Sequence, residues 1–171
     1  MEIFVRGSLP PKLSSGRGTR PDKVAAVGNK LNKVFERGYI RSGLVESTID
    51  FFDVEKGDDI RVVHNGTSCG LNDSLFAPSF WLPAAATASC HLMCHSWMAD
   101  ADMGEMFLNF PMDKKIRSRA GIDVTQLRSH IPALPDAPSS GRERKGRAIL
   151  RWERLFMGMK PSPHNAVRCF C

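Results

Sequence analysis

Two β-rich runs in the first half of the chain constrain its fold more than any other feature. The runs STIDFFDV and DIRVVHN contain many β-branched and aromatic residues, and EKGDD, a short segment with Gly and Asp, separates them. This pattern is typical of two antiparallel strands joined by a tight turn. We therefore predict a β-hairpin between Ser47 and Asn65.

An amphipathic helix is predicted before the hairpin. Apolar residues recur at intervals of three and four from Val24 to Phe35, and Gly38 follows as a stop signal. A chain of 171 residues is long enough for one domain with a core. Helix and hairpin together predict an α+β fold with an antiparallel sheet and packed helices.

Later segments give shorter signals. The run AAATASCHLMCHSW predicts a helix, and the run that follows it predicts a strand turning into a short helix or loop near Gly104. A further strand is predicted from about residue 149 to Phe156, and a helix from about His164. Residues 1–23 have the composition of a flexible basic tail, and residues 133–147 that of a flexible basic insertion.

Charge favours a polyanionic partner. Lys and Arg number 24 against 18 Asp and Glu, which gives a formal net charge of +6. Such an excess favours nucleic acid without requiring it, so a basic protein with another role stays open. The chain shows no secretory signal and no apolar run long enough to cross a membrane, so we expect an intracellular protein with no membrane partner and with reduced cysteines.

Two acidic residues mark a candidate metal site. Asp100 and Asp102 are two positions apart in the predicted strand, so both side chains would lie on one face. Adjacent carboxylates repel one another unless a cation neutralises them, and Mg²⁺ is a common one. Acidic pairs also occur at strand ends for structural reasons, so the pair alone does not establish a site.

Two cysteines and two histidines form a second candidate metal site. Cys90, His91, Cys94 and His95 have helical spacing, and zinc accepts both kinds of ligand. Structural zinc sites usually combine two separated ligand pairs, so ordinary thiols and a half-exposed histidine are the alternative.

Four segments taken in order resemble the fingers and first palm motifs of the reverse transcriptases of retroelements. They are ERGYIRSGLVESTIDFFDVEKGDDIRVVHNGTSCGLN, FWLP, DMGEMFLNFPM and RLFMGMKPSP. The resemblance implies an α+β fingers and partial palm of a right-hand polymerase. It places the fingers-like region at 24–96, the first palm motif at 97–115, a connecting region at 116–148 and a truncated second palm motif at 149–171.

The first palm motif carries the implied catalytic residue. An aromatic residue five positions after the family's catalytic aspartate and a proline four further on match Phe107 and Pro111, which selects Asp102. The resemblance implies that Asp102 and the Met103 carbonyl help to hold two Mg²⁺ ions for nucleotidyl transfer. It also places the backbone near Gly104 and Glu105 against the incoming triphosphate.

Other matching positions imply nucleotide and nucleic-acid contacts. Phe107 resembles the steric gate under the deoxyribose, although a core phenylalanine is an equal alternative. Arg61, and less securely Lys56, match the basic fingers residues that grip the triphosphate, where an exposed surface arginine is the alternative. In the second palm motif, Gly158, Lys160 and Pro163 match family positions that contact the nucleotide or the template-primer, and Met157 occupies a nucleotide-contacting position whose residue varies among families. An ordinary helix-entry turn is the alternative.

The chain departs from the family in two places. HNGTS stands where an aspartate and an arginine usually follow, which puts template contacts there in doubt. The aromatic-x-Asp-Asp motif, which supplies further metal ligands, is absent. We therefore expect a fragment that binds an RNA or DNA template, a DNA primer and deoxynucleoside triphosphates but is inactive alone. A non-catalytic nucleic-acid-binding remnant is the alternative, and an RNA-templated RNA polymerase a weaker third.

Overall fold

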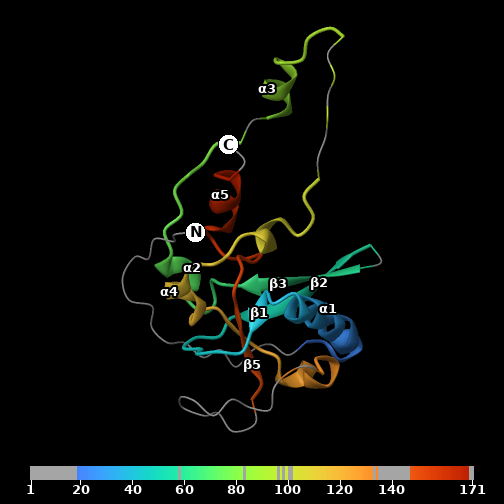
Figure 1. Cartoon of the computed structure of the whole chain (residues 1–171), viewed down its shortest axis with the longest axis vertical. Helices are drawn as coiled ribbons and strands as arrows, with labels where there is room; N and C mark the ends of the chain where they lie inside the picture. Colours follow the sequence, from blue (N-terminus) through green and yellow to red (C-terminus); the bar gives the residue numbers. More distant parts are fainter. Residues whose placement is uncertain are drawn as a thin grey trace.

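The predicted helix and hairpin both form in the computed structural model, which describes residues 19–57, 59–82, 84–95, 97, 99, 102–132, 134 and 147–169. Most of the predicted tail and insertion lies outside these residues. The described chain is a mixed α+β structure with small antiparallel sheets (Figure 1). None of its helices is long and apolar enough to cross a membrane.

The described chain contains the following helices and strands, given in chain order. They are η1 (Pro21–Lys23), α1 (Val24–Glu36), β1 (Ile40–Arg41), β2 (Asp50–Lys56), β3 (Asp59–Asn65), α2 (Leu71–Ser74), α3 (Ala85–Ser89), η2 (Met106–Asn109), α4 (Lys114–Arg117), β4 (Gly121–Asp123), η3 (Thr125–His130), β5 (Ile149–Trp152) and α5 (Ser162–Val167), where η denotes a 3-10 helix.

Helix α1 forms for the reason that the sequence indicated. Val27, Leu31 and Val34 are buried along one face, as their spacing predicts. That face packs on η3, and Gly28 allows close approach because a Cβ there would lie 2.5 Å from the His130 Cβ. The helix therefore contributes the outer wall of the core.

Two small sheets share the core. β2 and β3 pair antiparallel from Asp50↔Asn65 to Lys56↔Asp59, whereas β1 and β4 flank β5 in a second antiparallel sheet. Residues 47–49 join the two sheets, because the Ile49 amide donates to the Gly121 carbonyl at 2.7 Å and the Gly121 amide donates to the Ser47 carbonyl at 3.0 Å. The short strands β1 and β4 were not predicted, since two or three residues carry almost no alternation signal.

The segment after η2 runs beside the chain that follows β5. The Met112 amide donates to the Glu153 carbonyl at 2.9 Å, and the Leu155 amide donates to the Phe110 carbonyl at 3.0 Å. Since η2 ends just before Phe110, this pairing places η2 next to the turn at 157–160. Contacts between η2 and α5 complete the arrangement.

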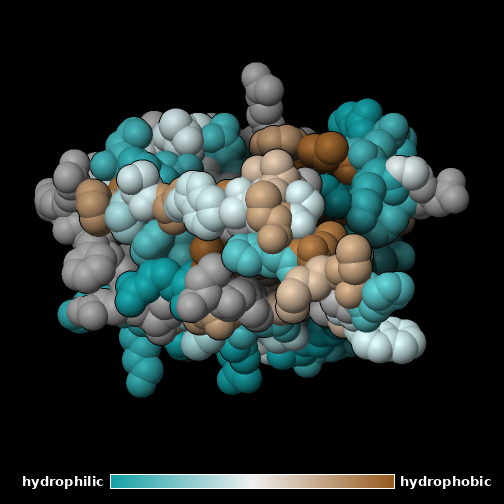
Figure 2. All heavy atoms as spheres, turned by 90° about the horizontal axis from the view of Figure 1, so that it is seen from above, coloured by the Kyte–Doolittle hydropathy of each residue, from teal (hydrophilic) through white to brown (hydrophobic). Residues whose placement is uncertain are grey.

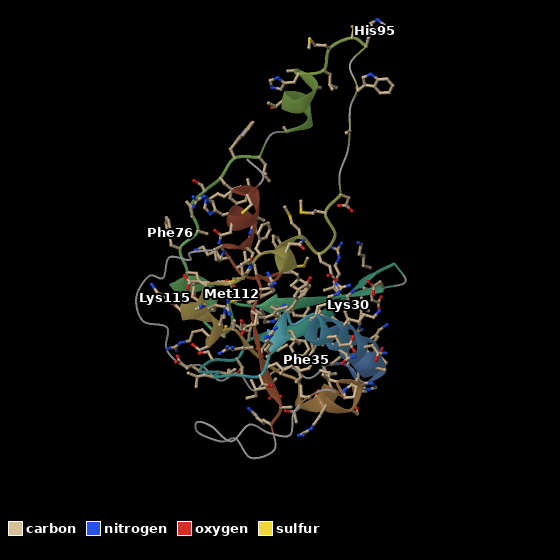
Figure 3. All side chains as sticks on the ribbon, viewed as in Figure 1. Lys30, Phe35, Phe76, His95, Met112 and Lys115 are labelled. Atoms are coloured by element: carbon tan, nitrogen blue, oxygen red, sulfur yellow. The ribbon has the colours of Figure 1, made fainter. Side chains whose placement is uncertain are left out.

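The described residues between 76 and 103, named the projection here, extend away from the sheets (Figure 1). Helix α3 lies within it at a distance from the body, and Figure 3 shows His95 at its far end and Phe76 at its base. Viewed from the side of the projection, the molecule shows tan and brown side chains grouped among teal ones (Figure 2). The ring of Phe80 contacts that of His164 in α5, with 6.0 Å between centroids, so the base of the projection touches the body.

Two predictions made for the projection differ from the structure. The helix predicted over 84–97 is limited to the five residues of α3, and the described residues after it are not helical. The predicted strand leading to Asp102 is wrong for the described residues 97, 99, 102 and 103, which have no strand pairing. A strand needs a neighbour for its backbone groups, and no described segment pairs with this one.

Candidate functional site

A cavity of about 560 Å³ lies where three distant parts of the chain meet. One wall comes from the segment 67–73 after β3, one from η2, and one from the turn and helix at 157–163. Its size suits a small organic ligand or part of a larger one. The lining residues are Thr67, Asn72, Asp73, Phe107, Met157, Gly158, Met159, Lys160 and Pro163.

The cavity combines apolar walls with a few polar groups. Phe107 is partly buried and packs against the core, while Met157 is 40% exposed. Lys160 and Asp73 are both exposed and bring one positive and one negative charge to the rim. Such a site can pack against a flat apolar group and attract a phosphate with its single ammonium.

The turn at 157–160 is held tightly against the end of β3. The His64 amide donates to the Met157 carbonyl at 3.2 Å. Gly158 has a φ of +101°, and a Cβ built on it would lie 1.9 Å from the His64 carbonyl oxygen. Only glycine meets both conditions, because it lacks a Cβ and tolerates positive φ.

A buried ring pair ties the same strand to β5. The Trp152 Nε1–H group donates to His64 Nε2 at 3.1 Å, and Phe156 packs on the histidine with 4.8 Å between ring centroids. His64 and Trp152 are both buried. The hairpin and the second sheet are thus joined behind the cavity by a hydrogen bond that requires Nε2 to be unprotonated.

Burial lowers the pKa of His64 to about 4, and the nearby Met157 carbonyl opposes this only weakly. No hydrogen-bond partner exists for His64 Nδ1 among the described residues. A charged imidazolium in this place would be poorly solvated and would lose the bond from Trp152. The ring is therefore neutral at pH 7.

The structure brings five of the sequence-predicted residues together around the cavity: Phe107, Met157, Gly158, Lys160 and Pro163. Their roles toward a ligand stay predictions. Sequence reasoning missed Met159 in the same turn, and it missed Thr67, Asn72 and Asp73, which complete the opposite wall. Thr67 lies in HNGTS, where template contacts were in doubt, and no motif assigned Asn72 or Asp73 a role.

The residues predicted around the metal lie elsewhere. Asp102 is exposed and does not line this cavity, and its role toward a metal stays a prediction. Met103 is 41% exposed, and Gly104 is also exposed. Glu105 forms an ion pair with Arg37 at the end of α1. Asp100 lies outside the described residues.

The two basic residues predicted to grip a triphosphate lie on the hairpin. Arg61 is exposed on β3 opposite Val54, and Lys56 is exposed at the end of β2 opposite Asp59. The Asp59 carboxylate pairs with Lys30 at 2.6 Å, and this bond holds its pKa below the usual value. No ion pair is recorded for Lys56 or Arg61 among the described residues, so both cations face solvent outside the cavity.

No metal centre forms in the described part of the chain. It contains no group of three or more His, Cys, Asp or Glu side chains that could hold an ion. Cys90, His91, Cys94 and His95 are exposed on the projection and do not form such a group. The described residues therefore fit neither the two-ion Mg²⁺ site nor the zinc alternative.

No family model and no curated protein matches the sequence. Solved structures do match. A foamy viral protease-reverse transcriptase dRH in complex with double-stranded DNA has a TM-score of 0.71 and 13% identity over 96% of this chain. The prototype foamy virus protease-reverse transcriptase CSH mutant has a TM-score of 0.68 and 13% identity over 96% of this chain.

The similarity is one of fold, and it covers only part of each solved chain. The chain spans 25% of the first solved chain and 19% of the second. The α+β arrangement with small antiparallel sheets therefore resembles a portion of a retroviral protease-reverse transcriptase.

Proposed function

We propose that the described part of this chain is the fingers and partial palm of a reverse-transcriptase-type polymerase, and that it binds template-primer. The observation that carries the proposal is the cavity. It joins Phe107 of the first palm motif with the 157–163 segment of the second, in a fold that resembles part of a protease-reverse transcriptase. Two motifs that the resemblance implied to be functional thus share one site.

The chemistry of the cavity supports a nucleic-acid ligand. Phe107, Met157 and Pro163 offer an apolar wall for a base or sugar, and Lys160 offers a cation to a phosphate. In this proposal Phe107 faces the deoxyribose. Lys56 and Arg61 contact phosphates that extend beyond the cavity.

We assign the described residues binding rather than catalysis. Template-directed transfer by two Mg²⁺ ions needs several carboxylates around one point, and Asp102 has no such neighbours in the described part of the chain. No metal-dependent step follows from these residues. The remnant that binds nucleic acid without chemistry makes the same binding prediction, and neither reading predicts primer extension by this chain alone.

Fluorescence anisotropy with a labelled RNA–DNA hybrid tests the proposal on the 171-residue chain. We expect the logarithm of the affinity to fall linearly as the logarithm of the salt concentration rises, because bound phosphates release counterions. Lys160→Ala should reduce the salt slope by about one and weaken binding several-fold. Lys33→Ala removes the same charge from the exposed face of α1 and serves as the matched control.

Two results would contradict the proposal. One is an affinity for hybrid and DNA duplex that is absent or insensitive to salt. The other is an equal effect of the two lysine substitutions, which would mean that net charge and not the cavity binds the duplex. Primer extension by the same chain should be undetectable with Mg²⁺ present, and robust synthesis would show that the assignment of binding alone is wrong.

A further inference from the structure

One polar side chain spans the cavity wall and holds two segments of the site together. Asn72 Nδ2 donates to the Gly158 carbonyl at 3.0 Å and to Thr67 Oγ1 at 3.1 Å. Its Oδ1 accepts from the Lys160 amide at 2.8 Å. The residue thus joins α2 to a turn that lies 86 to 88 positions further along the chain.

An amide is the only short side chain that can make these bonds. The Gly158 carbonyl requires a donor and the Lys160 amide requires an acceptor, and both groups lie on the same side of the turn. An aspartate would meet the Lys160 amide but would place a second acceptor against the Gly158 oxygen. These two backbone groups fix the orientation of the amide, and the Thr67 hydroxyl accepts the remaining Nδ2 hydrogen.

The surrounding backbone leaves room for this bridge. Gly66 lies beneath it, and a Cβ there would meet the Asn72 amide at 2.9 Å and the Gly158 oxygen at 3.0 Å. The backbone amide of Asn72 also donates to the Gly66 carbonyl at 2.9 Å, which anchors the start of α2. Small residues and the amide therefore form one packed unit at the cavity wall.

We propose that Asn72 is a positioning residue that sets where Lys160 meets the phosphate backbone of the bound template-primer; this inference rests on the proposed function. Asn72 binds the Lys160 backbone and leaves the ammonium exposed at the cavity rim. Holding the backbone places the charge, because the side chain extends from a fixed Cα. Without the bridge, the bond from the His64 amide to the Met157 carbonyl remains, among the described residues, as the hydrogen bond between this turn and β3.

A pair of substitutions in the same segment separates loss of the Asn72 bridge from the effect of an added negative charge. Asn72→Asp replaces the donor by a carboxylate. Asn65→Asp adds the same charge seven residues earlier, at the end of β3, where Asn65 Oδ1 only accepts a bond from the Ser68 amide at 3.1 Å. A carboxylate can accept the same bond, so Asn65→Asp keeps it and adds a negative charge opposite Asp50 of β2.

We expect Asn72→Asp to bind the labelled hybrid about tenfold more weakly than Asn65→Asp at pH 7.5, the size expected for loss of a hydrogen bond and a repulsive acceptor pair. The difference in affinity between the two variants should shrink as the pH falls toward 5. Protonation of the carboxyl introduced by Asn72→Asp restores a donor for the Gly158 carbonyl. Equal affinities at every pH would overturn the proposal.

Two further measurements keep the outcomes distinct. Thr67→Val removes only the hydroxyl that accepts from Asn72 Nδ2, and it should weaken binding about twofold. This variant covers the case in which Asn72→Asp does not fold. If the unaltered chain binds neither hybrid nor duplex, the proposed function fails. Hydrogen exchange of the Lys160 amide then decides the bridge alone: faster exchange in Asn72→Asp but not in Asn65→Asp supports it, and equal exchange overturns it.

Discussion

The projection and the body are both rich in apolar residues, yet they use them in opposite ways. Of the 28 residues at 76–103, 18 are of the apolar types that make up 42% of the whole chain. None of the described side chains of the projection is buried, and Trp97 is fully exposed. In the body, by contrast, Leu31, Ile122 and Phe156 are almost completely buried.

The difference lies in the range of the contacts rather than in composition. In residues 84–92 every recorded backbone hydrogen bond joins residues at most four apart. In the body, bonds such as Met112 to Glu153 and Trp152 to His64 join segments tens of residues apart. Apolar residues are removed from water only where distant segments supply a facing surface, so composition alone does not build a core.

The largest difference in stability is expected between substitutions of two glycines, one in the body and one beside the projection. Gly158→Ala should destabilise the body by about 4 kcal/mol, because it forces a Cβ against the His64 carbonyl at an unfavourable φ. Gly104→Ala, where the projection joins η2, meets nothing within 4 Å and should change stability by less than about 0.5 kcal/mol. Urea denaturation of both variants measures the two values, and similar losses would show that Gly158 is not confined as described.

The pH dependence of stability should distinguish histidines in the two regions. The folded pKa of His64 is about 4 against 6.5 for an ordinary histidine, so the unfolded chain binds more protons between these values. Stability is therefore fully present above pH 6.5 and falls by about 3 kcal/mol as the pH drops to 4.

Matched substitutions isolate this contribution. His64→Gln keeps an acceptor for Trp152 and should flatten the pH dependence of the free energy of unfolding over pH 4 to 6.5. His91→Gln and His95→Gln, in the exposed projection, serve as controls for the same substitution outside the body. An unchanged slope in His64→Gln would mean that other groups cause the acid sensitivity.

Substitutions of two tryptophans should differ less in their effect on stability. Trp152→Phe removes the donor to His64 and leaves unfilled space, which should cost about 2 kcal/mol. Trp97→Phe alters a fully exposed ring and should cost less than about 0.5 kcal/mol. Thermal unfolding compares the two variants, and a large loss in Trp97→Phe would indicate that this side chain is covered in solution.

The smallest effect is expected from Leu92→Gln in the projection. Leu92 is 54% exposed, so a polar side chain should change the free energy of unfolding by less than about 0.5 kcal/mol. Solubility should rise, because exposed apolar groups promote association. Light scattering at increasing concentration measures this, and lower solubility would contradict the exposed state of the projection.

The candidate site shows the same division between local and distant information. Sequence motifs indicated Phe107, Gly158 and Lys160, because their spacing within short segments is recognisable. Nothing in the sequence around Asn72 indicated a partner almost ninety residues away. The strand expected before Asp102 failed for a related reason, since the run has strand-like alternation but no described segment pairs with it.

The sequence by itself determined the features whose cause lies within a few residues. The apolar stripe placed α1, and the two β-rich runs with their Gly-Asp turn placed the β2–β3 hairpin. Only the tertiary structure decided which segments form the cavity, which histidine is buried, and that the apolar projection stays exposed. Local patterns fix backbone conformation over intervals of two to four residues, whereas burial and the meeting of side chains depend on surfaces that distant segments bring together.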